Sequence, residues 1–160
     1  MTSGARIWVL HLAVLAALGL APLVVPPYHA TNLARIMVLA VFAMGYNIAF
    51  GYTRLLSLGH AMFLSAGMYA TGLLIALGGW PAGPALLAGA GAGAGVALVV
   101  GLLALRTTGA AFMIVTLMFA QAGYLTILYF GDVTRGDEGF NLARDARMIF
   151  GLDLVSDRRN

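Results

Sequence analysis

GYTRLLSLGHAMFLSAGMYATG, residues 51–72, is the stretch of the chain that decides its fold. It places one His, two Ser, two Thr and four Gly among apolar residues. Around it, residues 1–131 contain no Asp, no Glu and no Lys, and only four Arg. The surface of a soluble protein needs more charge than this, so we interpret the region as membrane-embedded. Polar groups at membrane depth typically mark a translocation pathway or a contact between helices.

The composition of the whole chain indicates the same class. Hydrophobic residues make up 61% of the chain and charged residues 9%, whereas ordinary globular domains carry about 25% charged residues. A soluble chain of 160 residues would still expose about 30% of its unfolded surface, which these few polar side chains cannot cover. The chain has no Cys, which excludes disulfides and thiolate metal sites, and we expect no metal site of another kind. All nine basic residues are scattered Arg, so a net charge of +3 does not indicate nucleic-acid binding.

Five apolar segments come close to the length of about 20 residues that a helix needs to cross a bilayer. Pro26 and Pro27 end the first segment, and the run from Gly78 to Pro81 separates the third from the fourth. The third segment is the least hydrophobic and is either one straight span or a broken, re-entrant one. The sequence therefore predicts an all-α polytopic membrane protein with about five transmembrane helices. The segments are Ile7–Val25, Leu33–Phe50, Leu55–Leu77, Ala82–Leu105 and Ala110–Phe130.

The charged residues divide the chain into two regions. Residues 1–131 form the predicted transmembrane region, and residues 132–160 form an external polar loop or tail. All six acidic residues and five of the Arg lie after residue 130. The acidic residues there match no known cation-binding loop, so we interpret this segment as solvated.

Small residues recur in the fourth segment at the spacing of one helical face. Residues of this size let two membrane helices approach closely, so this face predicts helix packing. The face consists of Gly89, Gly93, Ala97 and Gly101.

Polar and aromatic residues of the third segment fall on two neighbouring stripes when it is drawn as a helix. These stripes favour either a lining for a translocation pathway or a contact in which Ser and His hydrogen-bond across an interface. No acid before Asp132 can orient the imidazole of His60, so a Ser57–His60 hydrolase is disfavoured and no catalytic residue is predicted. One stripe carries Ser57, Ala61, Ser65 and Tyr69, and the other carries His60, Phe63 and Gly67.

Three motifs occur in order along the chain. The first is Asn47-x-x-x-Gly51-Tyr52, followed by Ser57-Leu58-Gly59-His60-Ala61-x-Phe63 and Gly67-x-Tyr69. The second is Leu105-Arg106-x-x-Gly109-x-x-Phe112, followed by Val115-Thr116-Leu117 and Ala120-Gln121. The third is Gly136-Asp137-Glu138-Gly139-Phe140. Together, over roughly residues 32–154, they resemble the branched-chain amino-acid ABC transporter permeases of the LivM type.

The chain departs from that family in two ways. Arg54, Ser65 and Arg135 each stand where the family usually has Gly. Family members are also about twice as long, and their second half carries the coupling helix that docks on the ATPase subunit. By this resemblance the chain looks like the N-terminal half of a permease, with an incomplete ABC importer fold.

The resemblance implies a heteromeric importer in a bacterial inner membrane. Its partners would be a second permease subunit, ATP-binding cassette subunits and an external substrate-binding protein. No cofactor is expected in this chain, because without any Lys it cannot form a phosphate-binding loop, so ATP is hydrolysed on partner subunits. The implied substrates are branched-chain amino acids or related small solutes such as urea. The alternative is a non-transporting truncated membrane protein, or an assembly partner of a full permease.

Seven residues are candidates for lining the pathway. Leu58, Gly59 and His60 could form the N-terminal end of a discontinuous helix that offers backbone N–H groups to a substrate carboxylate. The rival interpretation is that Gly59 and His60 only fix the packing of the third segment on the second. The seven candidates are Asn47, Ser57, Gly59, His60, Phe63, Tyr69 and Thr116.

The distribution of Arg predicts the topology. With a cytoplasmic N-terminus, Arg6, Arg54 and Arg106 lie inside and only Arg35 lies outside, in agreement with the excess of positive charge on cytoplasmic loops. Reporter fusions made after Arg106 and after Asn160 are therefore expected to report opposite sides of the membrane. If both fusions report the same side, one predicted span has to be removed.

Overall fold

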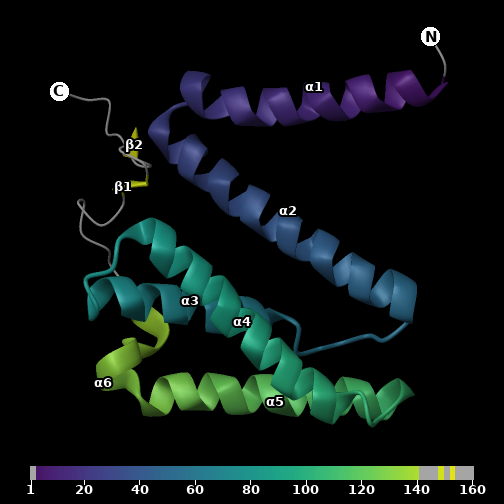
Figure 1. Ribbon diagram of the computed structural model, residues 1–160, viewed down its shortest axis with the longest axis vertical. Coiled ribbons are helices and arrows are strands. Elements are labelled where there is room, and N and C mark those ends of the chain that lie inside the picture. Colours follow the sequence, from purple (N-terminus) through teal and green to yellow (C-terminus); the bar gives the residue numbers. More distant parts are fainter. Residues whose placement is uncertain (1–2, 141–147, 150–151, 154–160) are drawn as a thin grey trace. The chain divides into compact units, whose positions relative to one another are not determined.

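The computed structural model describes residues 3–140, 148–149 and 152–153, and its fold is all-α, as predicted (Figure 1). The chain divides into two compact units, Met1–Gly45 and Tyr46–Asn160, and the contacts that build the candidate site lie within the second. Two short strands, β1 (Met148–Ile149) and β2 (Leu152–Asp153), pair antiparallel, with Met148 opposite Asp153. The helices are α1 (Ser3–Val24), α2 (Pro27–Thr53), α3 (Ala61–Ala76), α4 (Ala82–Ala104), α5 (Gly109–Tyr129), α6 (Gly131–Thr134) and a 3₁₀ turn, η1 (Gly136–Glu138).

Large apolar side chains cover the outer surfaces of these helices. On α4, Leu87 is 76% exposed, and on α5 Met118 is 67% exposed. Within the part of the chain that the structure describes, three helices are long and apolar enough to cross a membrane. Hydrocarbon, not water, suits such a surface, so the chain is a membrane protein. The three helices are Thr31–Thr53, Ala82–Ala104 and Gly109–Tyr129, and the shorter apolar helices are Arg6–Ala21 and Ala61–Ala76.

The third predicted segment is broken. Residues 54–60 are not helical, and α3 begins only at Ala61. Its 16 residues correspond to about 24 Å, which is less than the hydrocarbon thickness of about 30 Å. Of the two alternatives for this segment, one straight helix is therefore wrong. Ser57 does not share a helical stripe with Ala61 and Tyr69, because it lies outside the helix.

Two residues explain where the break lies. Arg54 has a φ of 57°, a left-handed conformation that ends α2, while its N–H still donates to the carbonyl oxygen of Phe50 at 2.9 Å. Gly59 has a low helix propensity and lies in a turn. The next helix can therefore begin only after this residue.

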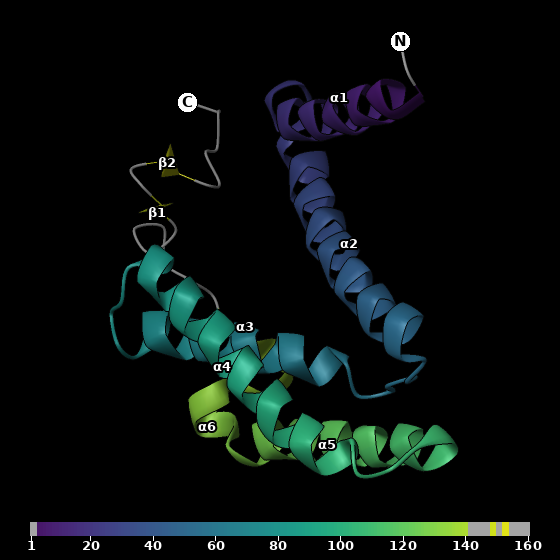
Figure 2. The same cartoon turned by 45° about the vertical axis from the view of Figure 1, so that its right-hand side comes forward.

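Helices α3 and α4 cross at their glycines, with α5 lying against the pair (Figures 1 and 2). A methyl group added at Gly93 would lie 2.8 Å from the carbonyl oxygen of Phe63, and one added at Gly67 would lie 3.1 Å from that of Gly89. A methyl group at Gly89 would overlap the Thr71 hydroxyl and lie 2.6 Å from the carbonyl oxygen of Gly67. The two helix backbones are thus in direct contact at these positions.

Apolar side chains fill the space beside this glycine contact. One buried cluster, Ile75, Ala82 and Ala85, joins the end of α3 to the start of α4. A second cluster joins α4 to α5 and is extended by residues that precede or begin α3. It consists of Val100, Ala104 and Phe112, with Leu55, Met62, Phe63, Val96, Val115 and Phe119 packed against it.

Gly93→Leu is expected to lower the Tm of the detergent-solubilised protein, because the new side chain collides with the α3 backbone. Overpacking of this kind costs about 1–3 kcal/mol. Gly91→Leu is the matched control, because Gly91 lies on the same helix and has no atom within 4 Å of an added methyl group. Both substitutions change helix propensity equally. Equal Tm values for the two variants would contradict a close contact between α3 and α4.

Candidate functional site

The connection between α2 and α3 is held against α5 by one polar contact. The backbone N–H of Leu58 donates to the Thr116 hydroxyl at 3.2 Å, and that hydroxyl donates to the carbonyl oxygen of Met113 at 3.0 Å. Thr116 is only 3% exposed. The hydroxyl therefore satisfies a backbone donor of the irregular segment, as non-helical backbone at membrane depth requires.

Gly59 lies directly on the backbone of α5. A methyl group at this position would overlap the carbonyl group of Thr116 and would lie 3.4 Å from the Cβ atom of Ala120. The side of Gly59 that lacks a side chain is therefore covered by protein. This contact assigns the need for glycine to packing on α5, rather than on α2 as the rival interpretation had it.

Aromatic rings connect the end of α2 to the start of α3. The rings of Tyr46 and His60 have centroids 5.2 Å apart, and those of His60 and Phe63 lie edge to face at 5.6 Å. Tyr46 also stacks on Phe50 within α2, at 6.4 Å. His60 is therefore surrounded by aromatic neighbours on both helices.

Ser57 and Asn47 differ in their surroundings. The Ser57 hydroxyl oxygen is shielded from solvent and, within the described residues, has no hydrogen-bond partner. A buried hydroxyl without a partner costs free energy, so this atom is a place where a polar ligand or a water molecule would be stabilised. Asn47 is exposed on α2, and its Oδ1 atom lies 3.7 Å from a methyl group built on Gly51.

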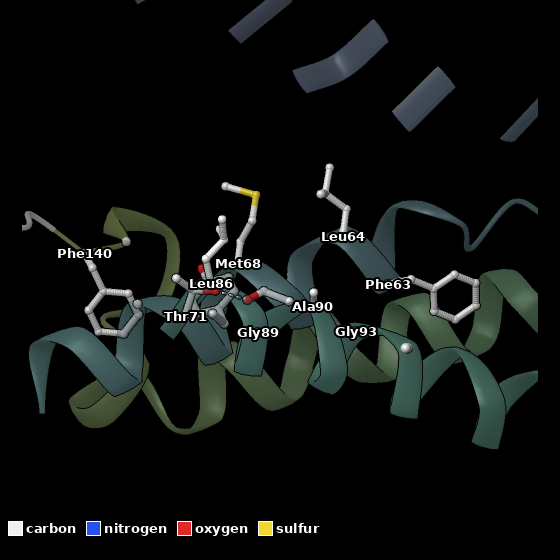
Figure 3. Close-up of a pocket in the computed structure, with 14 residues that line it drawn as sticks. Phe63, Leu64, Met68, Thr71, Leu86, Gly89, Ala90, Gly93 and Phe140 are labelled. Carbon is white, nitrogen blue, oxygen red and sulfur yellow. Dashed lines mark hydrogen bonds between the residues drawn. The ribbon is translucent and has the colours of Figure 1, made fainter. Parts of the chain in front are cut away.

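A cavity of about 640 Å³ lies along α3 and α4. Its floor includes Gly89 and Gly93, and Leu64 and Met68 rise beside it (Figure 3). Phe63 and Tyr69 also line the cavity, and Phe140 lies at the opposite end from Phe63 (Figure 3). The lining is almost entirely apolar, so the cavity suits hydrocarbon groups rather than a charged group.

Six of the seven predicted pathway residues thus fall into two places, and Asn47, on α2, belongs to neither. We call the first place the junction. It consists of Ser57, Gly59, His60, Phe63 and Thr116, which lie in the connection between α2 and α3, at the start of α3, and on the part of α5 that this connection contacts. Tyr69 lies apart from it, nearer the other end of α3, and its hydroxyl donates to the carbonyl oxygen of Gly136 at 2.6 Å.

The predicted packing face also divides. Gly89 and Gly93 are buried against α3. Ala97 is half-buried, and a methyl group added at Gly101 would have no atom within 4 Å. The close contact therefore occupies only the first half of the face.

Across the described residues, no group of three His, Cys, Asp or Glu side chains could hold a metal ion.

On the α3 side of the cavity, sequence reasoning named Phe63, Gly67 and Tyr69 but missed Thr71. Phe63, Gly67 and Thr71 recur at intervals of four residues, so the spacing used for α4 could have found Thr71. No local signal pairs Phe140 with Gly72. That contact joins two residues that are 68 positions apart in the chain.

Comparison with known proteins gives one match. Residues 29–158 match the family described as "Branched-chain amino acid transport system / permease component". No curated protein and no solved structure matches the chain significantly. The matched residues include α3, α4, α5, the junction and the cavity.

Gly59→Ala is expected to destabilise the packing of the junction on α5, because its methyl group overlaps the Thr116 carbonyl group. Overpacking of this kind lowers the free energy of unfolding by about 1–3 kcal/mol. We expect this loss to be measured as a lower Tm in detergent. Gly51→Ala is the control, since its methyl group makes only an ordinary 3.7 Å contact with Asn47. A Tm unchanged by Gly59→Ala would show that α5 can move away from the junction without cost.

Proposed function

Because the chain belongs to the family of permease components of branched-chain amino acid transport systems, we propose that it is a permease subunit of an ABC importer, of the LivM type. Its substrates are branched-chain amino acids or related small solutes. It works with a second permease subunit, ATP-binding cassette subunits that hydrolyse ATP, and an external substrate-binding protein. Its location is a bacterial inner membrane. The family is one of transporter components and not of enzymes.

The observation that carries this proposal is the family match over a region that contains an irregular, polar junction between apolar helices. A break in a membrane helix is tolerated where the backbone is buried in protein or lines a cavity. Here the backbone at Leu58 is bonded to Thr116, while the Ser57 hydroxyl lacks a partner. The junction therefore combines a fixed frame with a buried hydroxyl whose hydrogen-bonding capacity is unused among the described residues.

We assign the contact with substrate to the side chains of Ser57 and His60. The glycine at position 59 is covered by α5, which favours a side-chain contact over an approach to its backbone. Ser57 and His60 can donate or accept hydrogen bonds, and neither carries a permanent charge. Such contacts are weak and reversible, as a conduit requires. Phe63 links the junction to the apolar cavity, since its ring contacts His60 and it also lines the cavity.

His60→Ala, introduced at the matching position of a full-length homologous permease, is expected to reduce uptake of labelled leucine about tenfold or more. Assembly with the ATPase subunits, measured by co-purification, is expected to stay intact. His29→Ala is the control, because His29 lies within the matched residues, is exposed, and has its described ring contact with Tyr28 of the same helix. A parallel loss of uptake and assembly would assign His60 to packing and refute its place in the pathway.

A further inference from the structure

Residues 134–140, here called the strap, leave the end of α5 and α6 and return to α3. The base of the strap is fixed to α5. The Thr134 hydroxyl contacts the carbonyl oxygens of Ile127 at 2.7 Å and Phe130 at 3.0 Å, and it accepts a hydrogen bond from the Gly136 N–H at 3.2 Å. The base is thus held at one point by several bonds.

The tip of the strap, Gly136–Phe140, is fixed to α3 by two contacts. The Tyr69 hydroxyl donates to the Gly136 carbonyl oxygen at 2.6 Å. The Phe140 ring lies on Gly72, where an added methyl group would collide with the ring, and it meets the Tyr69 ring edge to face at 6.1 Å. Gly72 is buried and accommodates the ring because it has no side chain. One hydrogen bond and one ring therefore hold the tip.

The backbone between base and tip has the conformation of a hinge. Arg135 and Gly139, which flank the short turn η1, have φ values of 59° and 68°, and Gly136, the first residue of η1, has a φ of 51°. Closure motions are commonly absorbed by a few loop residues of this kind. Arg135 is the residue that separates the base at Thr134 from the contacts with α3.

The two sides of the strap differ in polarity. Asp137 and Glu138 are exposed, and the one described partner of the Asp137 carboxylate is the Tyr124 hydroxyl, at a long 3.4 Å. Phe140 faces α3 and, with Gly139 and Gly72, closes one end of the cavity (Figure 3). Lifting the strap would leave its charges in water and would expose only this end of the cavity.

We propose that the strap is a hinged lid, which swings about Arg135 and carries Gly136 away from Tyr69 and Phe140 away from Gly72. In the closed position described above, Phe140 fills the end of the cavity. In the open position the cavity is continuous with the side of the membrane on which the strap lies. This device goes beyond the proposed function, and its test measures access to the cavity rather than transport.

The test uses a single introduced thiol, because the chain contains no Cys. Thr71→Cys places the thiol in the cavity lining towards the Phe140 end, and Ala94→Cys places one elsewhere in the same lining. The full chain is reconstituted in nanodiscs, and the rate of reaction with a charged, membrane-impermeant maleimide is measured. Each thiol is studied in the parent background and with Tyr69→Phe, Phe140→Ala or Tyr129→Phe. Tyr129 is 83% exposed and serves as the matched tyrosine control.

Tyr69→Phe is expected to raise the labelling rate of the Thr71→Cys thiol about fivefold, as loss of one hydrogen bond predicts. Phe140→Ala is expected to raise it about tenfold or more, while Tyr129→Phe and the Ala94→Cys thiol show no change. Equal rates in all backgrounds would overturn the lid, because Phe140 would then cover nothing. An equal rise for both thiols would also overturn it, because it would indicate general loosening of α3 and α4.

Hydrogen exchange on the same samples gives a second measure that does not depend on the thiols. With Tyr69→Phe, the amides of the strap from Arg135 to Phe140 are expected to exchange faster by one common factor, with α4 unchanged, because a lid opens as a unit. Faster exchange at Gly136 alone would mean local fraying and would refute the hinged motion.

Discussion

Direct backbone contact between α3 and α4 is the constraint on which the rest of the second unit depends. Lipid tails are as apolar as Leu, so membrane helices gain little from burying apolar side chains against each other. Close approach is gained instead where side chains are missing, at Gly67, Gly89 and Gly93. This approach brings the Thr71 hydroxyl over Gly89 and keeps bulky residues at the edges of the crossing. The cavity is therefore a consequence of the crossing, since its floor is glycine and its walls are larger side chains.

The same rule applies to two other glycine contacts of the second unit. Gly59 brings the junction onto the α5 backbone, and Gly72 receives the Phe140 ring. Because glycine has no side chain, another group occupies the space beside it at each position. This group is the Thr116 carbonyl group at Gly59 and the Phe140 ring at Gly72. Hydrogen bonds then fix the geometry, from the Leu58 N–H to Thr116 before the start of α3 and from Tyr69, near the middle of α3, to Gly136. The candidate pathway and the strap thus contact different parts of one short helix.

Much of this arrangement could be predicted from the sequence. The absence of acidic residues and Lys before residue 132 indicated an all-α membrane fold, and the spacing of small residues indicated a packing face that includes Gly89 and Gly93. The start of α3 could not be placed, because it depends on a left-handed Arg54 and on α5 covering Gly59. An Arg residue disfavours the left-handed backbone conformation that Arg54 adopts, so the sequence does not predict it. The covering of Gly59 by α5 is a contact between distant segments, which local sequence patterns do not reveal. The separation of Tyr69 from the junction was missed for a related reason, because helical periodicity says nothing about the partner of a hydroxyl.

Arg54 combines backbone strain with electric charge at one point of the chain. A left-handed residue other than glycine costs about 1–2 kcal/mol, and Arg54 adopts this conformation directly after the last residue of α2. In return, a positively charged residue follows directly after α2, at the negative end of the helix dipole, where a cation is favoured. The same charge opposes any sliding of this helix end towards the centre of the bilayer, where an Arg costs about 2.5 kcal/mol or more. The charge of Arg54 therefore limits how deep in the bilayer the break between α2 and α3 can lie.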